Sequence, residues 1–432
     1  MFLRYPLDQV NAFLFHKQSL AAPAAGQRVA DLIAQVGSLR GAPPATPYLS
    51  LWARSADLLP ADLDAALYET RSVLRVPALH SRLHLVPVAD WPAYRAVMGA
   101  LWADDLAELA AYPHGGPGAM PGERPHAGPE LTLDDIVRRI LEVLGTRGPC
   151  TIEELAAYLP ELDRRIYHDP DEPDLGYSRL GTRLLPALCA RGTLVRAQPR
   201  GGWRSESYTY AALSHWLPEP LGPAIDRRQA LRQVAAGYLH AFGPATVGDL
   251  HNWLGGLSRR EVVAAVLELG SAVERIQIAG LAGEFLLLAE EVEALAAFQP
   301  GERAVALLPA HDHYPVAYID TSRFLDPLQR ERVFDRVGEP AGTVWLDGAV
   351  VGLWWLQWRD ERIVARLFEA VDPEGLALVG ERARALAEFL AFATFDIDIG
   401  LLDEEDEEAQ VPVAGVDMAG ETAGIVLTSQ GD

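Results

Sequence analysis

Between residues 226 and 290, apolar positions recur first at helical spacing and then at strand spacing. Ser/Thr-x-x-acid patterns at 246–249 and 258–261 are typical of capping boxes, so they predict two helix starts behind an earlier helix. Two β-rich runs, 273–278 and 284–288, follow and are joined by a Gly-bearing turn. Three helices followed by a β-hairpin are the element order of a winged helix, which we therefore predict here.

An earlier stretch echoes this pattern. The segment GPCTIEEL at 148–155 matches GPATVGDL at 243–250, and both combine a Gly-Pro break with a Thr-x-x-acid cap. A third helix at 178–191 and wing strands at 195–197 and 203–210 complete the predicted copy, so we expect tandem winged helices. Such modules often place a helix in the DNA major groove, but the same shape also serves in protein binding, so the fold alone does not assign a function.

The first 111 residues carry several short helical patterns and one β-leaning run, 73–88, and are predicted to form a winged-helix-like unit. His80, Arg82 and His84 would share one face if that run is a continuous strand. They are therefore candidates for lining a phosphate or base pocket, with a partly buried strand beside a cleft as the equal alternative.

After residue 302 the pattern changes to strands, which predicts a small antiparallel β-barrel and a terminal helix, and hence an α+β fold overall. The strand-like runs are 304–308, 315–319, 342–346, 350–358 and 363–368. The predicted units are an N-terminal winged-helix-like unit at 1–111, a Gly/Pro-rich linker at 112–130, a second winged helix at 131–215, a third at 226–290, the barrel with its helix at 302–392, and an acidic, disordered tail at 393–432.

Composition narrows the class of protein. The 432 residues are 49% hydrophobic, yet no apolar run approaches the length of a membrane span. Cys150 and Cys189 are too few for a disulfide framework or a conventional zinc site, and the N-terminus shows no secretion-signal pattern. We expect a cytoplasmic protein of bacterial type, monomeric, with no cofactor, no metal and no membrane association.

The net charge of −23 sets a condition on any nucleic-acid partner. DNA-binding proteins draw much of their affinity from basic residues at phosphates. Eleven acidic residues and no basic ones follow residue 392, which leaves −12 on the rest of the chain. DNA contact therefore requires arginines gathered on one surface. The acidic tail itself is a candidate mimic of nucleic-acid charge that competes for this surface.

Several stretches together resemble the AlkZ-like winged-helix family of bacterial DNA glycosylases. They are PYLSLWAR (47–54), RLHLVPVADWP (82–92), LCARGTLVR (188–196), YLHAFGPATVGDLHNWLGG (238–256), LLPAHDHYPVAY (307–318) and VWLDGAVVGLWW (344–355). The resemblance implies tandem winged helices with a C-terminal β-barrel, a concave face for double-stranded DNA, and removal of alkylated purines with unhooking of interstrand crosslinks.

The sequence departs from that family at the expected catalytic positions. The family signature is Gln-x-Gln or Gln-x-Asp just before the segment matched by PYLSLWAR, where these side chains orient a water and stabilise positive charge on the sugar. Counting back from Pro47, the two positions fall on Arg40 and Ala42. Arg cannot accept a hydrogen bond from water and Ala offers no polar group, so the usual hydrolysis is not expected. The family's Arg-Gly-Thr before Leu-His is also replaced here, by residues 80–82.

Further candidates follow from position and residue type. His311, Asp312 and His313 resemble a metal tripod, but neighbours on a strand alternate sides, so a structural or pocket-lining Asp312 is preferred. His84 and Asp312 are the candidate pocket residues. The candidate DNA contacts are Arg40, Arg54, His80, Arg82, Arg179, Arg183, Arg196, Arg200, Trp203, Arg204, Arg259 and Arg260. The arginines around 179–204 have a solvated face paired with acids at 169–174 as an alternative, and Trp203 has core packing.

The sequence thus favours a DNA-binding protein, for damaged or distorted duplex, that lacks the ordinary glycosylase activity. One alternative is an active glycosylase that hydrolyses N-glycosidic bonds of alkylated bases with a different set of residues. A second alternative is a protein-interaction or regulatory module that no longer binds DNA.

Overall fold

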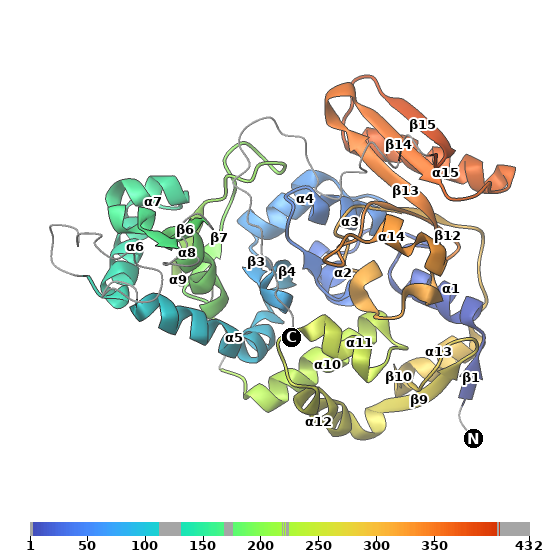
Figure 1. Ribbon diagram of the computed structural model, residues 1–432, viewed down its shortest axis with the longest axis horizontal. Helices are drawn as coiled ribbons and strands as arrows, with labels where there is room; N and C mark the ends of the chain where they lie inside the picture. The colour runs from blue at the N-terminus through green and yellow to red at the C-terminus, as the bar shows by residue number, and fades with distance from the viewer. Residues whose placement is uncertain are drawn as a thin grey trace.

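A computed structural model describes residues 3–111, 131–167, 176–217, 219, 221, 224–403 and 406 (Figure 1). The predicted linker at 112–130, the acids at 169–174 and the tail from 407 onward lie outside these residues. The N-terminal elements are β1 (Leu3–Tyr5), α1 (Leu7–Lys17), α2 (Val29–Val36), β2 (Leu39–Arg40), α3 (Thr46–Arg54), α4 (Pro60–Asp64), the π-helical turn η1 (Ala65–Glu69), β3 (Val73–Pro77), η2 (Leu79–Ser81), β4 (Leu83–Pro87) and α5 (Trp91–Ala111).

The β-leaning run at 73–88 is a hairpin, so the condition under which His80, Arg82 and His84 would share one face, a continuous strand, is not met. Strands β3 and β4 pair antiparallel, with Pro77 opposite Leu83. Between them the chain turns through η2, where His80 takes a left-handed backbone conformation with φ of 52°. A side chain in such a turn leaves the alternation of the strand, so His80 does not share a strand face with His84.

Two helix-and-hairpin groups follow the N-terminal elements. The first comprises α6 (Leu133–Arg147), α7 (Ile152–Tyr158), β5 (Arg165–Tyr167), β6 (Tyr177–Arg179), α8 (Leu180–Arg191), β7 (Leu194–Arg196), β8 (Tyr210–Ala212) and α9 (Leu213–Trp216). The second comprises α10 (Arg227–Phe242), α11 (Val247–Leu254), α12 (Arg259–Leu269), β9 (Val273–Ile278), β10 (Phe285–Leu288) and α13 (Val292–Ala297).

The two groups share the local features that the sequence echo predicts. Capping boxes start α7, α11 and α12. The residue that precedes the capping threonine bridges to the second strand of the hairpin in both copies, through Cys150 and Tyr210 in the first and Ala245 and Leu286 in the second. In each bridge the backbone hydrogen bonds run in both directions. The start of the second helix is therefore tied to the hairpin in the same way twice.

The C-terminal strands form one sheet, which also takes in part of the predicted tail. Its elements are β11 (Val305–Leu308), α14 (Arg330–Val333), β12 (Thr343–Leu346), β13 (Ala349–Gln357), β14 (Arg362–Leu367), α15 (Pro373–Phe389) and β15 (Asp396–Leu401). The strands pair in the order β11-β12-β13-β14-β15, so closure into a barrel is not seen among the described strands. The run at 315–319 begins with a short 3-10 turn rather than a strand. The segment that begins the predicted disordered tail is ordered as β15, which runs parallel to β14.

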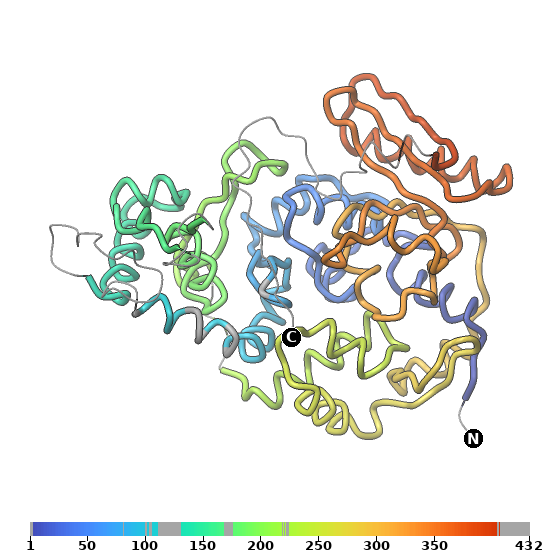
Figure 2. The backbone as a smooth tube through the Cα atoms, viewed as in Figure 1, coloured from blue at the N-terminus to red at the C-terminus, as the bar shows by residue number. Residues whose placement is uncertain are grey.

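Parts of the chain that are far apart in sequence lie side by side (Figure 2), and hydrophobic packing joins them. One core unites the N-terminal elements, the group from α10 to α13 and the C-terminal sheet, while most of the group from α6 to α8 has a core of its own. Strand β1 extends the β9–β10 hairpin as a third, parallel strand. None of the helices in the described ranges has the length and apolarity needed to cross a membrane.

Candidate functional site

A pocket of about 290 Å³ opens where the N-terminal elements, α11 and the segment between β11 and β12 meet. Of the described residues that line it, three are arginines, Arg40, Arg82 and Arg330, and one, Glu339, is a carboxylate. The remaining lining residues are Leu79, His80, His84, Asn252, Trp253, His313, Pro315, Val316, Tyr318, Ile319, Thr321, Phe334, Val337 and Gly338. The pocket is therefore cationic on balance, with apolar side chains among its charges.

Glu339 lies at the centre of this charge cluster. Nη2 of Arg40 donates to both carboxylate oxygens, at 2.5 and 2.6 Å. Arg82 forms an ion pair with Oε1, and Nδ1 of His311 lies 3.1 Å from Oε2. Burial alone would raise the pKa of Glu339, but the hydrogen bond from His311 and the charges of Arg40 and Arg82 bring it to about 2. The carboxylate is therefore ionised at neutral pH.

The local backbone explains how these side chains meet. Arg40 is the last residue of β2 and pairs with His84 of β4, which places both side chains at the same end of this sheet. Glu339 follows a tight turn in which the Asp335 carboxylate accepts from the backbone N–H groups of Val337 and Glu339, at 2.9 and 2.8 Å. The two partners lie 299 residues apart in the chain, so no local sequence pattern connects them.

The histidines of the pocket are held in their neutral form. Burial lowers the pKa of His84 to about 3, with the charge of Arg40 adding to the shift, and burial lowers the pKa of His313 to about 4. His80 stands at the mouth against Gly255, where an added Cβ would approach its Nδ1 to 2.6 Å. Burial also lowers the pKa of His80. At pH 7 the charge of the pocket therefore comes from its arginines and Glu339.

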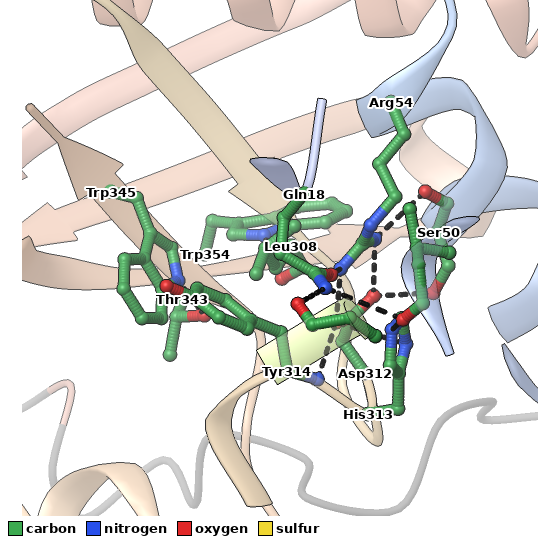
Figure 3. Close-up of polar contacts among 12 residues, drawn as sticks. Gln18, Ser50, Arg54, Leu308, Asp312, His313, Tyr314, Thr343, Trp345 and Trp354 are labelled. Carbon is green, nitrogen blue, oxygen red and sulfur yellow. Dashed lines mark hydrogen bonds and ion pairs between the residues drawn. The ribbon is translucent and has the colours of Figure 1, made fainter. Parts of the chain in front are cut away.

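A second Arg–carboxylate pair, between Arg54 and Asp312, lies fully buried in the core (Figure 3). Nη1 and Nη2 of Arg54 donate to the two oxygens of Asp312 at 2.8 Å each. Ser50 and the backbone N–H of Tyr314 complete the shell of donors, at 2.6 and 3.0 Å. Burial alone would raise the pKa of Asp312, but the charges of Arg54 and His313 and the hydrogen bonds from Arg54 and Ser50 together outweigh it, and the net shift is downward.

This burial corrects two predictions. Arg54 has no exposed surface, so it cannot make the DNA contact predicted for it. Asp312 is equally buried and is absent from the pocket lining, which leaves the structural interpretation of this residue. Within the described ranges, no group of three or more His, Cys, Asp or Glu side chains is arranged to hold a metal ion.

Comparison with known proteins identifies the family. A family model for AlkZ-like DNA glycosylases matches residues 33–394. The chain belongs to the AlkZ-like DNA glycosylase family. Its fold is similar to that of the Streptomyces sahachiroi DNA glycosylase AlkZ, with a TM-score of 0.69 and 20% sequence identity over 92% of this chain and 100% of that one. No curated protein matches the sequence.

Arg40 and Ala42, the two positions that the sequence resemblance assigns to the Gln-x-Gln or Gln-x-Asp motif, have different surroundings. Arg40 lies in the pocket wall and is 8% exposed, with Glu339 as its partner. Ala42 is exposed and is not among the lining residues. The sequence indicated Arg40 as a candidate, but reasoning from it missed Glu339 and Arg330, which carry no motif of their own, and weighed His311 only as part of a possible metal tripod.

The predicted DNA contacts of the second unit have intramolecular partners. Helix α8 packs against α5 and β3, and most of its residues are buried. Arg179 pairs with Asp163, Arg183 with Glu108 and Arg200 with Glu154, at 3.1 to 3.2 Å. These acids differ from those expected at 169–174. The structure therefore shows three separate ion pairs at this surface, which are partly exposed to solvent.

The remaining candidates are either packed against aromatic rings or exposed to solvent. Trp203 packs on Tyr48, with ring centroids 4.8 Å apart, and Arg204 lies over both Trp203 and Trp358. Arg196 lies over the ring of Tyr208. Arg259 and Arg260, at the start of α12, are exposed. The structure thus brings together Arg40, His80, Arg82 and His84 in the pocket, and leaves Arg259 and Arg260 as a separate exposed pair.

Proposed function

We propose that this family member binds double-stranded DNA, including damaged or distorted duplex, and does not hydrolyse N-glycosidic bonds in the family's usual way. In this proposal the groups from α6 to β8 and from α10 to β10 act as winged helices, and the molecule works as a monomer. The observation that carries the proposal is the Arg40–Glu339 pair, at the position that the resemblance assigns to the first glutamine of the family motif.

Electrostatics argue against glycosidic hydrolysis in this pocket. Departure of a base leaves positive charge on the sugar, and a site that accelerates this step places negative charge or acceptors there. Here three arginines face one carboxylate, and the pKa values of His84 and His313, about 3 and 4, keep both rings neutral at pH 7. A purine alkylated on a ring nitrogen is itself cationic, so the same arginines oppose its entry.

An active enzyme with a different residue set has one observation in its favour, which is the ionised carboxylate of Glu339 at the pocket wall. A carboxylate has about four lone-pair positions for donors. Each oxygen of Glu339 is already approached by two nitrogen atoms, from Arg40 together with Arg82 or His311. This leaves little capacity to hold an attacking water, so the enzyme alternative ranks second.

A role in protein binding is supported by the surface of α12. Val263 and Leu267 lie one turn apart on this helix and are 38% and 65% exposed. A helix that enters a DNA groove presents polar side chains to bases and phosphates. The exposed Arg259 and Arg260 at the start of the same helix favour the nucleic-acid role.

A titration of DNA affinity against salt concentration tests the proposal. Phosphate contacts release counterions, so log K should fall linearly with log salt, with a slope of at least about −3 for four or more phosphates. The double variant Arg259→Gln with Arg260→Gln tests the contribution of α12. It should reduce the magnitude of the slope by about 2 if both arginines contact phosphates. Absence of salt-dependent binding would leave the protein-binding role.

Incubation with alkylated duplex, followed by cleavage at abasic sites, tests the enzyme alternative. We expect no product from the native protein. Restoring the motif by Arg40→Gln and Ala42→Gln should also require Glu339→Gln, because the carboxylate would otherwise keep Arg82 at the pocket. Product from the native protein that disappears with Glu339→Gln would contradict the proposal and support Glu339 as an acceptor.

A further inference from the structure

Arg40 retains donor capacity on the side of the pocket. Only its Nη2 atom hydrogen-bonds to Glu339, and among the described residues Nε and Nη1 have no hydrogen-bond partner. The residue is 8% exposed and lines the pocket. A nearly buried guanidinium is stabilised by acceptors at its remaining N–H groups. The pocket therefore favours a ligand that brings oxygen acceptors to Arg40.

Two further arginines reinforce this preference at the opening. The Arg82 side chain is 44% exposed and has its single ion pair, among the described residues, with Glu339. Arg330, on the short helix α14, is exposed and lies over the ring of Phe334. With three arginines and one carboxylate, the lining carries a formal charge of +2 at pH 7. Its charge complements a ligand that carries two negative charges.

The shape of the site distinguishes among phosphates. Duplex DNA presents its phosphodiesters along a convex backbone, each with a single negative charge, whereas a pocket of about 290 Å³ admits the end of a strand. A phosphate monoester carries about −1.5 to −2 at pH 7. Ile319 and Val337 at the rim are 58% and 69% exposed and offer apolar contact to the sugar and base of a terminal nucleotide.

We propose that the pocket binds the terminal phosphate monoester of a DNA strand, at a nick, a gap or a broken end. Arg40 contacts the phosphate through its unused nitrogens, Arg82 and Arg330 contact it from the opening, and Glu339 holds Arg40 and Arg82 in place. This inference rests on the proposed DNA-binding function and adds the chemical group that the pocket recognises.

The test compares nicked duplexes of one sequence that carry a 5′-phosphate, a 3′-phosphate or only hydroxyl groups at the nick. We expect one of the phosphorylated forms to bind at least about tenfold more tightly than the hydroxyl form, which corresponds to about 1.4 kcal/mol. Inorganic phosphate at millimolar concentration should remove this difference. Equal affinity for all three duplexes would overturn the phosphate inference alone, whereas absence of binding to any duplex would overturn the proposed function as well.

Variants separate recognition at the pocket from general attraction to DNA. Arg330→Gln should abolish the preference for the phosphorylated nick, while Arg332→Gln, which removes the same charge from the same helix outside the pocket lining, should leave it intact. Both positions are exposed, so both variants are expected to fold.

Glu339→Gln gives a test of opposite sign. The amide removes the pocket's negative charge and still accepts a hydrogen bond from Arg40, so the preference for the phosphorylated nick should rise about tenfold. A catalytic acceptor would instead lose its function on this change. A decreased preference in a folded Glu339→Gln protein, or equal losses in Arg330→Gln and Arg332→Gln, would overturn the inference.

Discussion

Two Arg–carboxylate pairs connect the N-terminal elements with the segment between β11 and β12, and they differ in their surroundings. Arg54 and Asp312 are fully buried, and each oxygen of Asp312 accepts from Arg54 and from one further donor. Arg40 and Glu339 lie in a pocket wall, where one carboxylate faces two arginines, Arg40 and Arg82, and the His311 ring. The first pair is balanced in charge, and the second leaves positive charge facing the pocket.

The comparison shows that pairing alone does not reveal the role of a charged residue. A balanced buried pair is costly to break but offers nothing to a ligand. In an unbalanced pair at a pocket, solvent or a ligand can supply the acceptors that the arginine lacks. Both pairs connect the same two segments of chain, so the cluster around Asp312 can act as the rigid support on which the Arg40 pocket is built.

Breaking the buried pair should have the largest effect. Asp312→Ala leaves the Arg54 guanidinium without a counter-charge in the core, and we expect a loss of about 3–5 kcal/mol in the free energy of unfolding. Urea unfolding followed by tryptophan fluorescence measures it. The double variant Arg54→Met with Asp312→Leu should recover more than half of the loss, because it removes both charges together. A single-variant cost below about 1 kcal/mol would mean that water reaches this cluster.

The pH dependence of stability should report two buried histidines that line the pocket, His84 and His313, the second of which also lies beside Asp312. Burial lowers the pKa of His313 to about 4 and of His84 to about 3, whereas an unfolded histidine titrates near 6.5. Between these values the unfolded chain binds more protons, so stability rises with pH and is lost as pH falls from about 6.5 toward 4. Each of His313→Gln and His84→Gln should reduce the slope by about 1.4 kcal/mol per pH unit. An unchanged slope would show that the histidine is hydrated.

Neutralising the pocket carboxylate should have a smaller effect on folding. Glu339→Gln keeps one acceptor for Arg40, and Arg82 can turn to solvent, so we expect a cost of about 1–2 kcal/mol. The same urea experiment measures it beside Asp312→Asn, which should cost more because its partner has no access to water. If Glu339→Gln instead costs more free energy of unfolding than Asp312→Asn, then water reaches the Arg40–Glu339 pair less than it reaches the Arg54–Asp312 pair.

An exposed pair completes the series. Arg179 and Asp163 have side chains that are 55% and 54% exposed, and such pairs contribute little in water. Arg179→Ala should change the free energy of unfolding by less than about 0.5 kcal/mol. A loss above 1 kcal/mol would indicate that the ion pairs around α8 act as a unit.

Local chemistry made much of the fold predictable. Each capping box needs only a hydroxyl and a carboxylate three residues apart, and the structure has them at Thr151, Thr246 and Ser258. The short helical patterns predicted in the first 111 residues correspond to helices such as α1, Leu7–Lys17. The echo between 148 and 243 also anticipated a shared feature, since both copies place the residue before the capping threonine on the hairpin.

The site was less predictable because the side chains that form it are far apart in sequence and come together only in the tertiary structure. Nothing near Arg40 in sequence indicates that Glu339 will neutralise it, and nothing near Arg54 indicates complete burial. The face of His80 depended on a continuous strand, which the sequence could not establish, and a five-residue turn interrupts the run. Apolar alternation predicts strands, but it does not show where a hairpin turns.

The position of Trp203 has a consequence for how such chains can diverge. This residue comes from the hairpin loop of the second unit, yet its ring packs against Tyr48 of α3 and Phe389 of α15, with centroids 4.8 and 6.5 Å away. Replacing the second unit by that of another protein would remove the Trp203 ring and leave both aromatic neighbours without this contact. We therefore expect a relative with a different second unit to have an aromatic side chain at the same loop position, or to differ in α3 and α15 as well.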